Sequence, residues 1–102
     1  RKIKVNGQKY FLSHTVPEKG AMPQKPELCT GRDFVLGEPD YGEVYYDDIT
    51  LVTGHTPTIL IDVEFKGRIW KGNNHIAVDC GAVFGSPLGC ICLDTMEEFY
   101  TD

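Results

Sequence analysis

The sequence has no long hydrophobic run and no concentration of positive charge. No stretch approaches the roughly 20 consecutive apolar residues of a membrane-spanning helix, and no basic segment leads into an apolar one as in a secretion signal. The 10 lysines and arginines are scattered, and the formal net charge is −5. Proteins that bind nucleic-acid phosphates concentrate basic residues on one surface. We therefore expect neither membrane association nor nucleic-acid binding.

The chain has 4 cysteines, but their spacing is not that of a structural zinc site. Such sites use two close cysteine pairs, and the only close pair here is Cys90 and Cys92. Alternate positions on a strand share one face, so we expect these two to be small buried residues. Nothing else in the sequence indicates secretion, so we expect no disulfide framework and place the protein in the reducing cytoplasm.

The composition, with 102 residues of which 41% are hydrophobic and 25% charged, is that of one globular domain. The chain begins at Arg1 with strand-like sequence almost at once, so we expect it to be a piece of a larger protein. Asn6-Gly7 is typical of a tight hairpin turn. Residues 15–26 predict a loop and 32–36 a short helix. Short β-branched and aromatic runs predict about seven or eight strands; they lie at residues 3–5, 9–13, 49–53, 59–65, 68–70, 75–79, 88–93 and 98–100.

Two histidines stand where an apolar strand ends. His14 opens the long loop, and His55 follows Gly54, which we expect to let the backbone turn sharply and approach a ligand. Loops at strand ends gather around active sites. Imidazole suits manganese, iron or zinc, and two from separate loops could bind one ion together. The alternative is that each is an ordinary surface or hydrogen-bonded histidine, and spacing alone does not decide between them.

A third stretch, residues 79–85, is again a strand that runs into a glycine-punctuated loop. Gly81 would allow the backbone to lie close to a bound phosphate. For Asp79 we expect a local role, in which its carboxylate accepts hydrogen bonds from nearby amides in a strand-end turn.

Taken in order, these motifs resemble those of the calcineurin-like metallophosphoesterases, and most closely the bacterial and phage branch of the serine/threonine protein phosphatases. The resemblance spans nearly the whole chain and rests on four stretches: Tyr10 to His14, Gly54 to Thr58, Ile76 to Gly85, and Cys90 to Thr95 with Phe99-Tyr100.

The resemblance implies an α+β, β-rich fold, the C-terminal half of a four-layer α/β/β/α sandwich with short mixed strands and little helix. It also implies two divalent metal ions in the intact site, manganese first, with iron, zinc or nickel as alternatives. His14 and His55 correspond to the two histidines that bind one of these ions.

By the same resemblance Arg32 would clamp the substrate phosphate. The alternative is a surface arginine that pairs with Asp33 or Glu27, since such exposed pairs are common. Three further residues would shape the loops near the site: Gly54, Thr56 and Gly81.

The family's first half supplies Asp-x-His, Gly-Asp-x-x-Asp-Arg-Gly and Gly-Asn-His-Glu motifs, and none of them occurs here. Asp62, Asp79 and Asp94 lie in contexts that do not match. We therefore expect the parent protein to hydrolyse a phosphorylated protein or a small phosphoester, and this chain alone to be inactive.

Two other functions stay open: a non-catalytic β-rich binding module, and a hydrolase of dinucleoside polyphosphates or other phosphodiesters. The apolar surface that the missing half would cover predicts a homo-oligomer.

Overall fold

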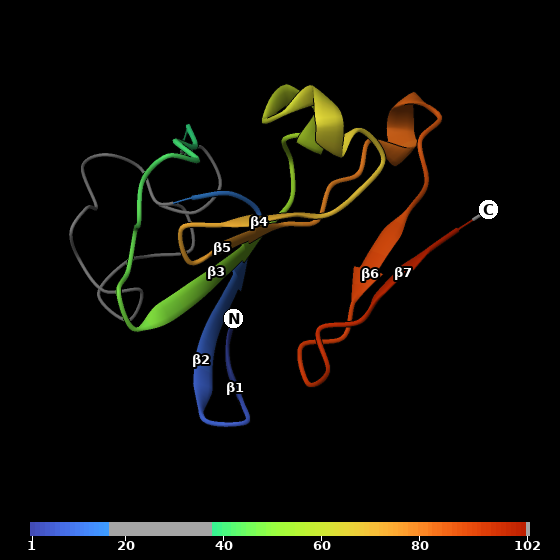
Figure 1. Cartoon of the computed structure of the whole chain (residues 1–102). Coiled ribbons are helices and arrows are strands. Elements are labelled where there is room, and N and C mark those ends of the chain that lie inside the picture. Colours follow the sequence, from blue (N-terminus) through green and yellow to red (C-terminus); the bar gives the residue numbers. More distant parts are fainter. Residues whose placement is uncertain (17–37, 102) are drawn as a thin grey trace.

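The computed structural model describes residues 1–16 and 38–101, which form two β-sheets and three short 3-10 helices (Figure 1). The larger sheet has five strands in the order β1-β2-β3-β5-β4, and the smaller pairs β6 with β7. This β-rich architecture with almost no helix confirms the coarse fold prediction for the described residues. The strands are β1 (Lys2–Val5), β2 (Gln8–Ser13), β3 (Ile49–Thr53), β4 (Trp70–Gly72), β5 (His75–Ala77), β6 (Gly89–Ile91) and β7 (Glu98–Tyr100), and the 3-10 helices are η4 (Thr58–Leu60), η5 (Val63–Phe65) and η6 (Ala82–Phe84).

Two tight turns set the register of the antiparallel strands. Asn6 and Gly7 have φ angles of 51° and 82°, the positive values that a two-residue type I′ hairpin requires. Asn73 and Asn74, with φ angles of 50° and 57°, join β4 to β5 in the same way. Asparagine adopts this conformation more readily than other residues with a side chain. The turn predicted at Asn6-Gly7 is confirmed.

The centre of the larger sheet is parallel. β2 pairs with β3, and β3 pairs with β5, in parallel register. Ser13 lies beside Thr53, which lies beside Ala77, so the three strands finish at one level. In β3 every residue except Thr50 is buried, as is usual for a parallel strand covered on both faces. The C-terminal ends of three strands therefore meet at one edge of the sheet.

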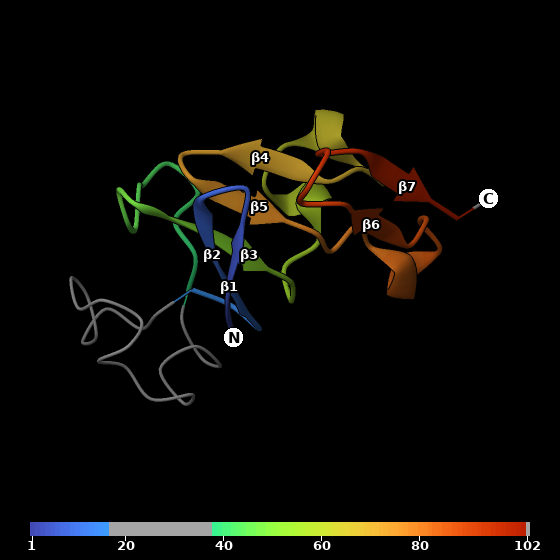
Figure 2. The same ribbon diagram turned by 90° about the horizontal axis from the view of Figure 1, so that it is seen from below.

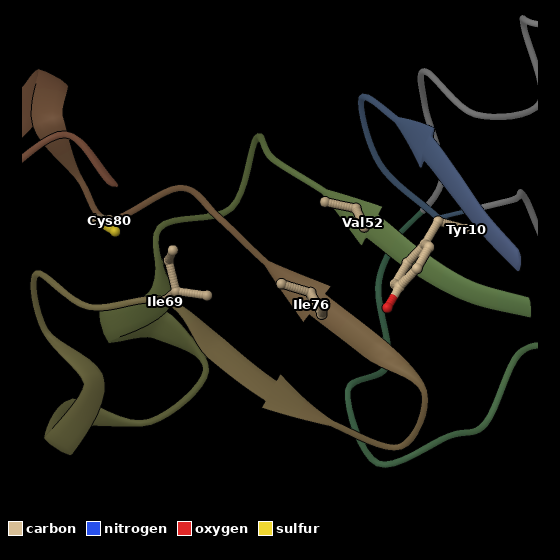
Figure 3. Packing of buried hydrophobic residues seen from close by; sticks show 5 residues of the cluster. All are labelled: Tyr10, Val52, Ile69, Ile76 and Cys80. Carbon is tan, nitrogen blue, oxygen red and sulfur yellow. The ribbon is translucent and has the colours of Figure 1, made fainter. Parts of the chain in front are cut away.

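The larger sheet has a hydrophobic cluster on each face. Neighbouring residues of a strand point to opposite faces, and Leu51 and Val52 accordingly belong to different clusters. The first cluster, shown in Figure 3, contains Tyr10, Val52, Ile69, Ile76 and Cys80. The second contains Val16, Tyr46, Ile49 and Leu51.

The smaller sheet lies beside the β4–β5 end of the larger one, as Figures 1 and 2 both show. The Tyr100 hydroxyl accepts a hydrogen bond from the backbone N–H of Ile69 at 3.0 Å. An ion pair joins Lys71 of β4 to Glu98 of β7, with 2.7 Å between Nζ and Oε2. Two polar contacts thus connect the smaller sheet to the β4 side of the larger one.

Residues 59–65 correct one prediction. Their alternating pattern predicts a strand, but they form η4 and η5. The Asp62 carboxylate accepts a hydrogen bond from the Glu64 N–H at 2.9 Å and so caps η5. The apolar residues Leu60 and Val63 are consequently 74% and 75% exposed. The spacing of apolar residues carries no information about a side-chain cap, and it is the cap that decides the conformation of this segment.

The prediction that Cys90 and Cys92 are buried is also corrected. Cys90 is exposed and Cys92 half-buried, because β6 belongs to a two-stranded ribbon that has an open face. Cys80 is buried, and the three cysteines of the described residues are free thiols. Cys29 and the helix predicted at 32–36 lie outside the described residues.

Three predicted strands begin or end elsewhere than expected: β4 starts two residues later than 68–70, β5 ends at Ala77, and β6 covers only Gly89–Ile91.

Within residues 1–16 and 38–101 no helix reaches the length and apolar character that crossing a bilayer requires.

Candidate functional site

The parallel centre of the sheet brings His14 and His55 together. His14 directly follows β2, and His55 comes two residues after the end of β3. The Gly54 N–H donates to the carbonyl of His14 at 3.1 Å, which continues the pairing of the two strands by one step. The imidazole centroids are 4.6 Å apart, with the ring planes tilted by 51°. Both side chains are exposed, so a ligand can reach them from solvent.

The backbone at His55 is strained. Its φ angle is 69°, in the left-handed region that residues with a side chain seldom occupy. The Thr56 N–H donates across it to the Gly54 carbonyl at 2.8 Å and closes a three-residue γ-turn. Such turns with positive φ are rare and strained, and strain of this kind clusters at functional sites. The tight turn aims the imidazole of His55 toward that of His14.

The position of this turn corrects the expectation for Gly54. Gly54 does not have a positive φ, and a Cβ atom placed on it would meet nothing within 4 Å. The sharp bend is made by His55 instead. Gly54 instead pairs with His14 through its N–H, one residue before the bend.

Asp79 and Gly81 form the third part of this edge, after β5. The Asp79 carboxylate accepts a hydrogen bond from the Gly81 N–H at 2.9 Å, and its carbonyl accepts one from the Thr58 N–H at 2.8 Å. The predicted local role of Asp79 is confirmed. Gly81 has a φ angle of 87° and begins η6, a conformation that favours glycine.

Tyr41 and His75 complete the surroundings of the site, and sequence reasoning missed both. Tyr41 lies before β3, in a segment without regular structure. Its ring stacks on His75 with 5.1 Å between centroids. His75 Nε2 lies 2.7 Å from the hydroxyl of Thr53, the last residue of β3. Tyr41 falls in a segment interrupted by glycine and proline, and no periodic signal marks it.

Burial shifts the pKa values of this inner pair. His75 is 1% exposed, and its Nδ1 has no hydrogen-bond partner. Burial lowers the pKa of His75 from 6.5 to about 4, because an imidazolium would lose its hydration there. Burial also raises the pKa of Tyr41, an effect that the hydrogen bond with Thr56 partly offsets. Both side chains are therefore neutral at pH 7.

Two imidazoles from adjacent strand ends form a donor set that suits a divalent transition metal. Within residues 1–16 and 38–101 no group of three or more histidine, cysteine, aspartate or glutamate side chains could hold a metal ion. The described residues therefore offer two protein ligands, and an ion bound there would take its other ligands from elsewhere. Arg32, the predicted phosphate clamp, lies outside the described residues.

Comparison with protein-family models, with curated proteins and with solved structures finds no match to this chain. The functional conclusion therefore depends on the geometry of the histidine pair.

Proposed function

We propose that this chain supplies the two-histidine side of a metal-dependent phosphoester hydrolase of the calcineurin-like metallophosphoesterase type. The observation that carries the proposal is the 4.6 Å between the imidazole centroids of His14 and His55. The two histidines come from sequence positions 41 residues apart (55 − 14), and adjacent parallel strands bring them together. Convergence of this kind is what a shared cation requires.

The roles of the residues follow from their positions. His14 and His55 would hold the cation as neutral imidazoles, manganese first, with iron, zinc or nickel as alternatives. A bound divalent ion activates water at neutral pH and stabilises charge on phosphoryl oxygens. The open space at Gly54 leaves the backbone accessible to a ligand. Thr56 and Gly81 border the same edge from the loops after β3 and β5.

Three aspartates of the chain accept hydrogen bonds from other residues of the chain. Asp62 caps η5, and Asp79 binds the Gly81 N–H. The Asp94 carboxylate accepts a hydrogen bond from the Asn6 side chain at 2.6 Å. The proposal therefore includes catalytic inactivity of this chain alone, since a dinuclear site needs bridging and terminal carboxylates that these residues do not offer.

The proposal extends to fold, substrate and location. The five-stranded mixed sheet and the ribbon beside it would be the C-terminal half of the four-layer sandwich. The parent protein would act on a phosphorylated protein or a small phosphoester in the cytoplasm.

The first test is metal binding by the chain. Isothermal titration calorimetry with Mn²⁺ and Zn²⁺ should give one ion per chain, and His14→Ala and His55→Ala should each weaken binding at least tenfold. Asp94→Asn is a matched control, because Asp94 carries a carboxylate, a possible metal ligand, but lies outside the proposed site. This variant should bind the metal ions as tightly as the parent does. Binding that survives both histidine substitutions would contradict the proposal and favour a non-catalytic binding module.

The second test is activity. The chain with Mn²⁺ should release no phosphate from p-nitrophenyl phosphate or from a phosphopeptide, whereas turnover that His14→Ala abolishes would show that these two imidazoles suffice. Release of product from a dinucleoside polyphosphate alone would support the phosphodiester alternative.

A further inference from the structure

The β1–β2 hairpin carries an excess of positive charge on a protein that is negative overall. Residues 1–9 contain four of the 10 basic residues and no acidic residue. Their formal charge is therefore +4 (4 − 0), and residues 10–102 carry −9 (−5 − 4). Salt screens the field of exposed charges beyond about 8–10 Å. The hairpin can thus attract an anion although the net charge of the chain is negative.

Two lysines of this hairpin stand directly opposite each other. Lys4 of β1 is paired with Lys9 of β2. The backbones of Arg1 and Leu12 exchange both hydrogen bonds, at 2.6 and 2.8 Å, and in an antiparallel ladder bonded and non-bonded pairs alternate. Lys4 and Lys9 are three steps further along the ladder and therefore form a non-bonded pair, in which the side chains lie closest. Like charges placed in this way repel each other.

The two ammonium groups have no counter-charge among the described residues. Both lysines are exposed, and within residues 1–16 and 38–101 neither of them forms an ion pair with a carboxylate. An anion that binds between the two groups replaces their repulsion by two attractions. The free chain is therefore arranged to gain from binding a doubly charged anion.

A cavity of about 330 Å³ lies beside this lysine pair. Ile49 lies next to Lys9 in the parallel pairing of β2 with β3, and it is 4% exposed. One wall of the cavity is therefore apolar and belongs to the core. The volume is within the range of pockets that hold small molecules. The residues that line the cavity are Lys2, Ile3, Lys4, Lys9, Tyr10 and Ile49.

This cavity is separate from the histidine pair. Lys9 is the second residue of β2, and His14 follows the last residue of that strand. Five residues of strand (14 − 9) span about 16 Å at about 3.3 Å per residue. Ile49 likewise begins β3, whereas His55 comes after its end. The cavity and the histidines thus lie at opposite ends of the same two strands, which Figure 1 shows side by side.

We propose that this cavity binds a small phosphate monoester, with the phosphate group between the ammonium groups of Lys4 and Lys9 and the apolar group of the ester against Ile49. A phosphate monoester carries close to two negative charges at pH 7, which matches two ammonium groups, whereas a carboxylate matches one. Lysine binds phosphate as a point charge. The apolar wall favours an ester over inorganic phosphate, because contact with Ile49 removes carbon atoms of the ligand from water. The inference is independent of the proposed function, since neither histidine takes part.

The test measures binding of phenyl phosphate, inorganic phosphate and benzoate to the metal-free chain by isothermal titration calorimetry at low ionic strength. One molecule of phenyl phosphate should bind per chain, roughly fivefold more tightly than inorganic phosphate and about tenfold more tightly than benzoate. In NMR spectra, phenyl phosphate should shift the amide signals of residues 2–9 and leave those of residues 54–56 in place.

Lys4→Gln and Lys9→Gln should each weaken phenyl phosphate binding about tenfold, because each removes one charged partner of the phosphate. Both variants should melt at or above the temperature of the parent, since a repulsion is removed. Lys66→Gln is the matched control, because Lys66 is exposed but does not line this cavity. It should bind phenyl phosphate as tightly as the parent does.

Two results would overturn the proposal. One is an affinity that Lys4→Gln and Lys9→Gln leave unchanged, or that they reduce only together with the melting temperature. The other follows from the position of β1 at the edge of the sheet, where lysines also keep a strand from pairing with other chains. If that is their only role, phenyl phosphate does not bind at millimolar concentration, and Lys4→Gln self-associates more than the parent in light scattering.

Discussion

At the scale of single residues, His55 combines a strained backbone with an exposed imidazole, and His75 combines a buried imidazole with an unpartnered nitrogen. The first arrangement costs stability and gains none from packing, since the side chain is exposed. The second keeps a titratable ring neutral behind the site. Substitution at the two positions should therefore have different effects.

His55→Gly is expected to raise the free energy of unfolding by up to about 1 kcal/mol, because glycine adopts positive φ without the steric cost. The same substitution should weaken metal binding at least tenfold, because one of the two imidazole ligands is lost. Urea denaturation monitored by circular dichroism measures the first effect.

His14→Gly is the matched control, since the φ angle of His14 is not positive. It should lower the free energy of unfolding by about 0.5–1 kcal/mol. Equal destabilisation by the two substitutions would show that the turn at His55 stores no strain.

His75 predicts a loss of stability in acid. Its pKa is about 4 in the folded chain and about 6.5 when unfolded, so the unfolded chain binds more protons between these values. Stability should be complete above pH 6.5 and fall by about 3 kcal/mol as the pH drops to 4. The groups that face the ring, Thr53, Tyr41, Tyr45 and Trp70, carry no charge in this range.

Urea titrations at pH 7, 5.5 and 4.5 measure this dependence. Between pH 6.5 and 4 the parent should lose about 3 kcal/mol more unfolding free energy than His75→Leu does. Parallel pH profiles for the two proteins would show that the ring is not the group responsible.

At the scale of elements, the β1–β2 hairpin depends on its backbone conformation. A Cβ atom on Gly7 would meet nothing within 4 Å, but the φ angle there is 82°. Gly7→Ala should therefore cost about 1–2 kcal/mol through strain alone. Gly54→Ala, with equal open space and an ordinary φ, should leave thermal stability nearly unchanged.

Differential scanning calorimetry compares the two glycine variants directly. A fall in melting temperature for Gly54→Ala as large as that for Gly7→Ala would contradict the description of the turn after β3. Unchanged stability of Gly54→Ala with weakened metal or phosphate binding would support close approach of a ligand at this position.

Elements with strong local signals could be predicted from the sequence. Asn6-Gly7 supplies the positive φ values of its turn, and the β-branched run Ile49–Thr53 matches β3 residue for residue. The conformation of residues 59–65 could not be predicted from the sequence. The Asp62 side chain caps a 3-10 helix there, and apolar residues of this segment face solvent. Periodicity reports burial only where a residue packs against a sheet or helix.

Part of the site could be predicted from the sequence, and part could not. The ends of parallel strands meet at one edge, so His14 and His55 could be paired from the sequence once their strands were recognised. Tyr41 stacks on His75, which lies 34 residues away in the sequence (75 − 41). Such contacts depend on tertiary packing and leave no local pattern.

At the scale of the whole molecule, apolar side chains gather around the 3-10 helices. Leu60, Val63, Val83 and Phe84 are between 74% and 83% exposed. Leu60 and Phe84 line one groove of about 360 Å³, whose floor includes Cys80. Exposed apolar surface of this kind favours association in water.

We therefore expect the chain to self-associate as its concentration rises, and the double substitution Leu60→Ser with Phe84→Ser to reduce this. Val44→Ser is the control, because Val44 is 48% exposed but does not line that groove. Size-exclusion chromatography with light scattering measures the mass. A parent chain that stays monomeric at millimolar concentration would contradict the expectation.

The most direct measurement is zinc K-edge X-ray absorption of the Zn²⁺-loaded chain, which counts imidazole ligands at the metal. Since the rings of His14 and His55 lie 4.6 Å apart, the account predicts two imidazoles in the parent chain and one in either His14→Ala or His55→Ala. A spectrum without imidazole scattering, or one that neither substitution changes, would contradict it.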